Sequence, residues 1–219
     1  MRLVFYGGGD QYDNREVDEK LLKTFSLKPS AKMAFIPASS YDSEVDFKYF
    51  VEQYKYFGFR KFLHFPIDIS HRSLLAKELF DVDRIHLGGG NTFEFLAVLR
   101  HFGFLSKLRK FAERGGVLTG LSAGAIIMAP TIMTASFPDF DCDSNDVNIT
   151  DFRALNLVDF EFFPHYQSRF DYMAAMKNYT KTIKRPLYAC PDGEAVFVID
   201  KTIEATKGVS IFSAGVLLE

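Results

Sequence analysis

The chain has 219 residues, of which 47% are apolar and 25% are charged, and its formal net charge is −2. This size suits one large domain or two small ones, and the composition excludes a disordered, collagen-like or coiled-coil protein. A nearly neutral chain has no overall positive field, so we expect no nucleic-acid partner.

Membrane, secretory and metal-binding signals are also absent from the sequence. The apolar run before Gly7 is too short for a signal-peptide core of about 7–15 residues, and the densest apolar stretch is broken at Pro130. Cys142 and Cys190 are too few and too far apart for a disulfide framework or a zinc site. We therefore expect a cytoplasmic protein without a membrane partner and without a metal.

Short apolar runs alternate with longer amphipathic segments along most of the chain. Glu44–Tyr56 has apolar residues at the spacing of one helix face. This alternation predicts an α/β fold, a mostly parallel sheet flanked by helices, with functional groups at the carboxyl ends of its strands. The runs that predict parallel strands are Leu3–Tyr6, Met33–Ile36, Phe62–Phe65, Arg84–Leu87 and Val117–Thr119.

The pattern changes after Asp159. Short β runs at Ala195–Asp200, Ile203–Thr206 and Val209–Phe212 are separated by turn-forming pairs, which predicts a C-terminal antiparallel meander. No linker, low-complexity segment or internal repeat divides the chain. We predict a single domain over residues 1–219.

The most informative motif is Gly120-Leu-Ser122-Ala-Gly124, which matches the nucleophile-elbow pattern G-x-S-x-G between a predicted strand and a predicted helix. A sharp turn there exposes the Ser122 hydroxyl, and the Ala123 amide at the start of the helix can donate to a developing oxyanion. The alternative is that Ser122 is only a helix N-cap.

Two further glycine clusters follow predicted strands. Gly88–Thr92 can form an anion-binding nest, which resembles the second half of an oxyanion hole. A dinucleotide fingerprint is excluded, because Phe93 occupies the position of its third glycine, and Gly7–Gly9 fails likewise at Tyr12. Tight strand-to-helix turns are the alternative for both clusters.

A nucleophilic serine needs a base, and His165 is the favoured one among five histidines. It follows Pro164 at the end of an aromatic run, where the chain becomes rigid and a strand ends. No H-E-x-x-H or clustered His/Cys spacing is present, so a metal-activated water is the weaker mechanism. The other four are expected to be structural: His64, His71, His86 and His101.

Several ordered motifs together resemble the peptidase E (aspartyl dipeptidase) and cyanophycinase family: Gly88–Phe93, Gly120–Ala125, Pro130-Thr131-Ile132, Pro164-His165, Pro191-Asp192-Gly193 and Phe212–Gly215. The resemblance implies a fold similar to the class I glutamine amidotransferases, with a serine at the elbow and no cofactor. It also implies Ser122 as nucleophile, His165 as base, and the Gly90 and Ala123 amides as oxyanion hole.

The acid that would orient His165 is harder to assign from the sequence. Alignment with peptidase E places Ser136 or Phe137 at its position, so the expected carboxylate is missing there. Cyanophycinases instead have an acid after the histidine, which points to Asp192, and we predict that residue. The carboxylates that remain candidates are Asp139, Asp141, Asp192 and Glu194.

These residues predict a serine hydrolase that cleaves small peptides, with dipeptides as expected substrates and an acyl-enzyme at Ser122. Asn91 and Arg169 are predicted substrate contacts, and a preference for N-terminal Asp comes only from the resemblance. Arg169 is the one Arg near a poorly matched segment, which puts that preference in question. The alternatives are a small-molecule esterase or amidase and a catalytically silent peptide-binding relative. We expect a monomer or a homodimer.

Overall fold

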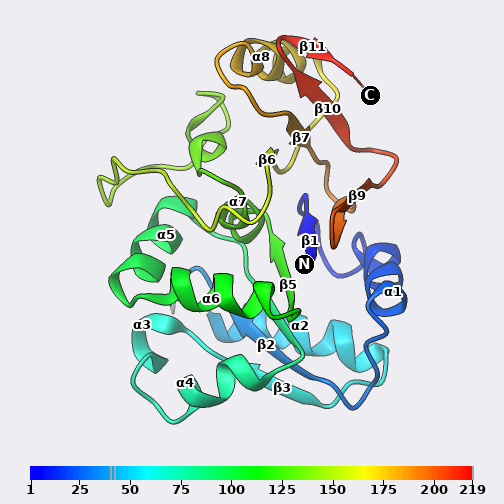
Figure 1. The fold of residues 1–219 in the computed structure, drawn as a ribbon, viewed down its shortest axis with the longest axis vertical. Helices are drawn as coiled ribbons and strands as arrows, with labels where there is room; N and C mark the ends of the chain where they lie inside the picture. Colours follow the sequence, from blue (N-terminus) through cyan, green and yellow to red (C-terminus); the bar gives the residue numbers. More distant parts are fainter. Residues whose placement is uncertain (40, 42, 219) are drawn as a thin grey trace.

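The computed structural model describes residues 1–39, 41 and 43–218. Its main sheet has seven strands in the order β3-β2-β4-β5-β1-β8-β9 (Figure 1). Strands β1 to β5 run parallel, whereas β8 pairs antiparallel with β1, and β9 with β8. The strand bounds are β1 Arg2–Tyr6, β2 Lys32–Ile36, β3 Lys61–His64, β4 Arg84–Leu87, β5 Val117–Leu121, β8 Ala195–Ile199 and β9 Thr202–Ala205.

Helices cover both faces of this sheet. Helices α1 and α2 pack on one face through Val17, Leu21 and Phe50, and helices α5, α6 and α7 pack on the other. The parallel α/β architecture predicted from the alternating pattern is therefore confirmed. The helix bounds are α1 Arg15–Thr24, α2 Ser43–Tyr56, α3 Ile67–Ser70, α4 Leu75–Glu78, α5 Thr92–His101, α6 Phe104–Glu113, α7 Ala123–Met128 and α8 Phe170–Thr180, with 3-10 turns η1 Leu79–Asp81 and η2 Met133–Ser136.

A second sheet of four strands, in the order β11-β10-β7-β6, lies above the main sheet in Figure 1. The predicted antiparallel strands at the C-terminus are confirmed, but they do not form one meander, because β8 and β9 extend the main sheet while β10 and β11 join the second one. Phe212 explains the departure, since it is fully buried in the core beneath α8 together with Met176. The bounds are β6 Glu161–Phe163, β7 Leu187–Ala189, β10 Ser210–Ser213 and β11 Val216–Leu217.

The two sheets share aromatic packing. The Phe5 ring on β1 lies 5.1 Å from Phe160 and 5.4 Å from Phe162, and Phe160 lies 4.5 Å from Tyr188 on β7. All three phenylalanines are fully buried. Within the described residues, no helix is both long enough and apolar enough to cross a membrane.

We propose that the two sheets unfold as one domain, because Phe160 contacts both. Phe160→Ala should lower the free energy of unfolding by about 3–5 kcal/mol while keeping a single transition. Urea unfolding followed by circular dichroism and by tyrosine fluorescence measures both quantities. Phe170→Ala is the control, because this ring is 87% exposed and its loss should cost less than about 0.5 kcal/mol. Two separate transitions in the unmodified protein would contradict the proposal.

Candidate active site

Ser122 occupies a strained turn between β5 and α7. Its backbone has φ 51° and ψ −113°, a conformation that costs a non-glycine residue about 1–3 kcal/mol. The turn needs glycine on both sides: a Cβ on Gly120 would overlap the Gly124 backbone, and one on Gly124 would overlap the Leu87 carbonyl. The Ser122 amide donates to the Tyr6 carbonyl at 3.2 Å, which ties the elbow to the neighbouring strand β1.

The structure brings Ser122, His165 and Asp192 into one hydrogen-bonded chain. Ser122 Oγ lies 2.8 Å from His165 Nε2, and His165 Nδ1 lies 2.7 Å from Asp192 Oδ1. When Nδ1 donates to the carboxylate, Nε2 is left as the acceptor for the serine proton. The side chains of His165 and Asp192 are 47% and 54% exposed, so a substrate can reach the imidazole.

Asp192 is the one of the four candidate carboxylates that reaches His165 in the described part of the chain. Asp141 accepts a hydrogen bond from the Tyr172 hydroxyl at 2.6 Å. Glu194 points toward Gly208, where an added Cβ would lie 2.7 Å from its Oε1. Asp139 is exposed in the turn after the 3-10 segment η2.

The backbone after β1 holds the histidine and the acid in place. The Gly7 carbonyl accepts from the His165 amide at 2.9 Å, and the Gly8 carbonyl accepts from the Gly193 amide at 3.3 Å. A Cβ on Gly8 would overlap both Asp192 Oδ1 and the His165 ring. Sequence reasoning did not assign Gly7–Gly9 to the site, although three glycines at the carboxyl end of a strand were a usable signal.

Asn14 also contacts the glycine loop after β1, and sequence reasoning missed this residue. Its Nδ2 donates to the Gly8 carbonyl at 3.0 Å and to the Asp10 carbonyl at 2.9 Å. Asn14 is buried, with only 3% of its surface exposed. Asn14 thus holds the glycine loop through backbone carbonyls. A lone Asn before a helix has no sequence pattern that would distinguish this role from capping.

The amides predicted to form the oxyanion hole, those of Gly90 and Ala123, belong to segments next to the elbow. Ala123 is the first residue of α7, so its amide has no intrahelical acceptor. Gly89 lies against the elbow, since a Cβ built on it would be 3.8 Å from Ser122 Cβ, and Gly90 follows with φ 132°. Among the described residues, the Gly90 and Ala123 amides donate no hydrogen bond. Both are therefore available to a developing negative charge.

The two predicted substrate contacts are both held by neighbours. Asn91 caps α5, because its Oδ1 accepts from the Glu94 amide at 3.0 Å and its Nδ2 donates to the Ser144 carbonyl at 2.8 Å. Arg169 forms an ion pair with Asp171 at 2.5 Å. These contacts account for both side chains structurally, and their binding to a substrate stays a prediction.

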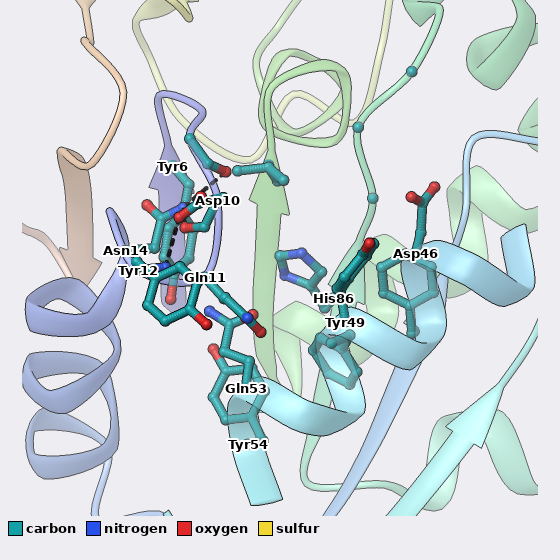
Figure 2. Close-up of a pocket in the computed structure, with 17 residues that line it drawn as sticks. Tyr6, Asp10, Gln11, Tyr12, Asn14, Asp46, Tyr49, Gln53, Tyr54 and His86 are labelled. Carbon is teal, nitrogen blue, oxygen red and sulfur yellow. Dashed lines mark hydrogen bonds between the residues drawn. The ribbon is translucent and has the colours of Figure 1, made fainter. Parts of the chain in front are cut away.

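A cavity of about 620 Å³ opens beside the elbow, and Figure 2 shows the residues that line it. One wall is the loop from β1 to α1, the opposite wall is α2, and Gly88–Gly90 with Leu121 form the end next to Ser122. No group of three or more His, Cys, Asp or Glu side chains in the described ranges is arranged to hold a metal ion.

A buried polar network lies behind this cavity. Asp18 on α1 is fully buried and accepts hydrogen bonds from the hydroxyls of Tyr6, at 2.8 Å, and Tyr54. Burial raises the pKa of the Asp18 carboxyl. The buried Arg84 guanidinium lies over the Tyr54 ring at 4.4 Å and donates to Thr119. The buried Asp18 carboxylate and the buried Arg84 guanidinium attract one another, and the network that they belong to holds the residues behind the cavity in place.

Gly8→Ala should separate the three hydrogen-bonded side chains, because the added methyl group would occupy the space of Asp192 Oδ1 and His165. The rate at which a fluorophosphonate labels Ser122 should fall by about 10²-fold or more. Gly103→Ala is the matched control, since Gly103 also has positive φ but has no neighbour within 4 Å of an added Cβ. Equal labelling rates in the two variants would contradict this account of Gly8.

The chain is similar in sequence and in fold to several known proteins. The uncharacterized peptidase Lmo0363 of Listeria monocytogenes is 33% identical over 179 residues, which are 78% of this chain and 83% of the relative. Peptidase E of a Nostoc species is 31% identical over 66% of this chain and 56% of its own length. A crystal structure of a candidate peptidase E protein from Listeria monocytogenes superposes with a TM-score of 0.73 and 25% identity, covering 94% of this chain and 97% of that one. The model of peptidase family S51 matches residues 3–206, and the chain belongs to that family.

Proposed function

We propose that this protein is a serine peptidase that hydrolyses small peptides, with dipeptides as its main substrates, through an acyl-enzyme at Ser122. The observation that carries the proposal is the hydrogen-bonded series Ser122–His165–Asp192 at a strained elbow, in a chain that belongs to a peptidase family. Family membership supports a peptide substrate. The mechanism and the substrate length are the proposed additions.

The chemistry follows from the positions of the polar atoms. His165 Nε2 removes the proton from Ser122 Oγ as the oxygen attacks the substrate carbonyl, and Asp192 stabilises the imidazolium that forms. The amides of Gly90 and Ala123 donate to the oxyanion. His165 then protonates the leaving amine, and a water activated by the same imidazole hydrolyses the acyl-enzyme.

The substrate preference is the least constrained part of the proposal. An N-terminal Asp would need a cation near its carboxylate, and Arg169, the residue expected to supply one, is paired with Asp171. An esterase of the α/β-hydrolase type would have its acid between the serine and the histidine, whereas Asp192 follows His165. We further propose a cytoplasmic enzyme, monomeric or homodimeric, that does not bind nucleic acid.

Replacing the nucleophile tests the proposal directly. Wild type should hydrolyse at least one member of a dipeptide panel containing Asp-X, Glu-X, Gly-X and β-Asp-Arg, and Ser122→Ala should lower that rate by about 10⁶-fold. Amine release measured by liquid chromatography follows the reaction. Ser106→Ala, at an exposed position on α6, should retain full activity. Hydrolysis that survives Ser122→Ala would refute the assignment of the nucleophile.

Two carboxamide variants test the acid. Asp192→Asn should lower kcat by up to about 10⁴-fold, because the amide nitrogen can donate to Nδ1, which favours the wrong tautomer of His165, and the neutral amide stabilises the imidazolium poorly. Asp139→Asn should change kcat less than about twofold. Steady-state kinetics on the best dipeptide compare them. A larger loss of kcat for Asp139→Asn than for Asp192→Asn would instead assign the orienting acid to Asp139, in the loop before β6.

A further inference from the structure

We infer that the cavity beside Ser122 binds the N-terminal residue of the substrate and selects one with a carboxamide side chain, Asn or Gln. Two fixed polar atoms of the lining carry this inference, a hydrogen-bond donor on His86 and a hydrogen-bond acceptor on Gln53. The inference rests on the proposed function, because it assigns the cavity to the acyl side of the bond that Ser122 attacks.

The position of the cavity indicates which half of the substrate it receives. Gly88–Gly90 and Leu121 form its end at the elbow, whereas His165 and Asp192 do not line it. His165 gives its proton to the leaving amine, so the leaving group lies on the His165 side. The acyl group then extends from Ser122 into the cavity, and in a dipeptide this group is the N-terminal residue.

The hydrogen bonds behind His86 fix which ring nitrogen carries the proton. Nδ1 lies 2.8 Å from Thr119 Oγ1 and 3.4 Å from Arg84 Nη2. A guanidinium only donates hydrogen bonds, and Arg84 Nε also donates to Thr119 Oγ1 at 3.1 Å, so the Thr119 hydroxyl proton is directed to Nδ1. Burial and the Arg84 charge hold the pKa of His86 well below its usual range, which keeps the ring neutral. Nδ1 is therefore an acceptor, and the one proton of the imidazole is on Nε2.

His86 Nε2 is a donor that is open to the cavity. The ring lines the cavity, although only 7% of the residue is exposed. Within the described residues Nε2 donates to no acceptor, and it is not sealed in the core. Contacts with the rings of Phe35 and Phe50, whose centroids lie 5.8 and 5.4 Å away, hold the imidazole in this orientation. A side chain that enters the cavity without an acceptor would exclude water from this donor and leave it unpaired.

Gln53 on α2 supplies the matching acceptor. Its Nε2 donates to the buried Asp18 carboxylate, which also accepts from two tyrosine hydroxyls. This bond assigns the amide nitrogen to the Asp18 side, and it leaves Oε1 unsealed and without a partner in the part of the chain that the structure describes. Gln53 lines the cavity one helical turn after Phe50, the residue whose ring contacts His86 (Figure 2).

A donor and an acceptor in one cavity are complementary to a carboxamide. Its carbonyl oxygen can accept from His86 Nε2 while its amino group donates to Gln53 Oε1. A carboxylate would place an acceptor oxygen against Gln53 Oε1, and an ammonium group would leave the His86 donor unpaired. An apolar side chain would leave both polar atoms without a partner. The lining therefore disfavours acidic, basic and apolar N-terminal residues.

Binding to the Ser122→Ala variant tests the inference apart from catalysis. By calorimetry, Gln-Ala or Asn-Ala should have a dissociation constant at least about tenfold lower than its carboxylate counterpart, Glu-Ala or Asp-Ala, and its apolar counterpart, Met-Ala or Leu-Ala. Equal affinities within both sets, tighter binding of a carboxylate or apolar dipeptide, or no detectable binding of either carboxamide dipeptide would overturn the inference.

A second substitution locates the preference. Gln53→Met in the Ser122→Ala background should reduce the ratio of carboxamide to carboxylate affinity by about fivefold to tenfold, because the acceptor is lost while the volume is similar. Gln167→Met makes the same change two residues after His165, outside this cavity, and should leave the ratio unchanged. Circular dichroism establishes that both variants are folded. An unchanged ratio in folded Gln53→Met would refute the inference.

Nitrogen NMR of His86 provides a measurement that needs no substitution in the cavity. In the Ser122→Ala protein at about pH 7, Nε2 should be protonated and Nδ1 bare, and the Nε2 resonance should shift on addition of Gln-Ala or Asn-Ala. A proton on Nδ1, or an Nε2 resonance that does not move at saturation, would contradict the assigned donor. Ser122-dependent hydrolysis without a carboxamide preference would leave the proposed function intact and reject only this inference.

Discussion

The close approach of the Gly7–Gly8 backbone to His165 and Asp192 is the contact on which the rest of the site depends. It is possible because β1 lies in the middle of the main sheet, between β5 and β8, and ends in residues without side chains. Through this contact, the strand next to the elbow also positions the histidine and the acid. A side chain at either glycine would separate groups that must stay within hydrogen-bond distance of one another.

The site is assembled at the junction of the two sheets. Ser122 comes from the main sheet, His165 follows β6 in the second sheet, and Asp192 lies on the connection from β7 to β8, which runs between them. The relative position of the sheets therefore sets the distance from Ser122 Oγ to His165 Nε2. The packing of Phe5 against Phe160 in the core therefore contributes to this distance.

Local patterns in the sequence were sufficient for the parts of the site that one segment builds alone. The elbow needs small residues around Ser122, so it is readable within a few residues. The oxyanion amides, predicted from glycines and a helix start, stay a prediction. The acid was harder, because Asp192 and Glu194 share one turn and only the fold shows which of them faces His165. The division of the C-terminal strands between two sheets was also missed, since it depends on where Phe212 is buried.

The cavity was beyond sequence reasoning for a related reason. Asp10 and Asp46 are 36 positions apart in the sequence, and each has polar neighbours that form no recognisable motif. They line one cavity because α2 and the loop from β1 to α1 cover the same face of the sheet. The proposed reacting groups are carried by other segments. Substitutions on α2 can therefore change the lining of the cavity without touching Ser122 or the glycine loop that contacts His165 and Asp192.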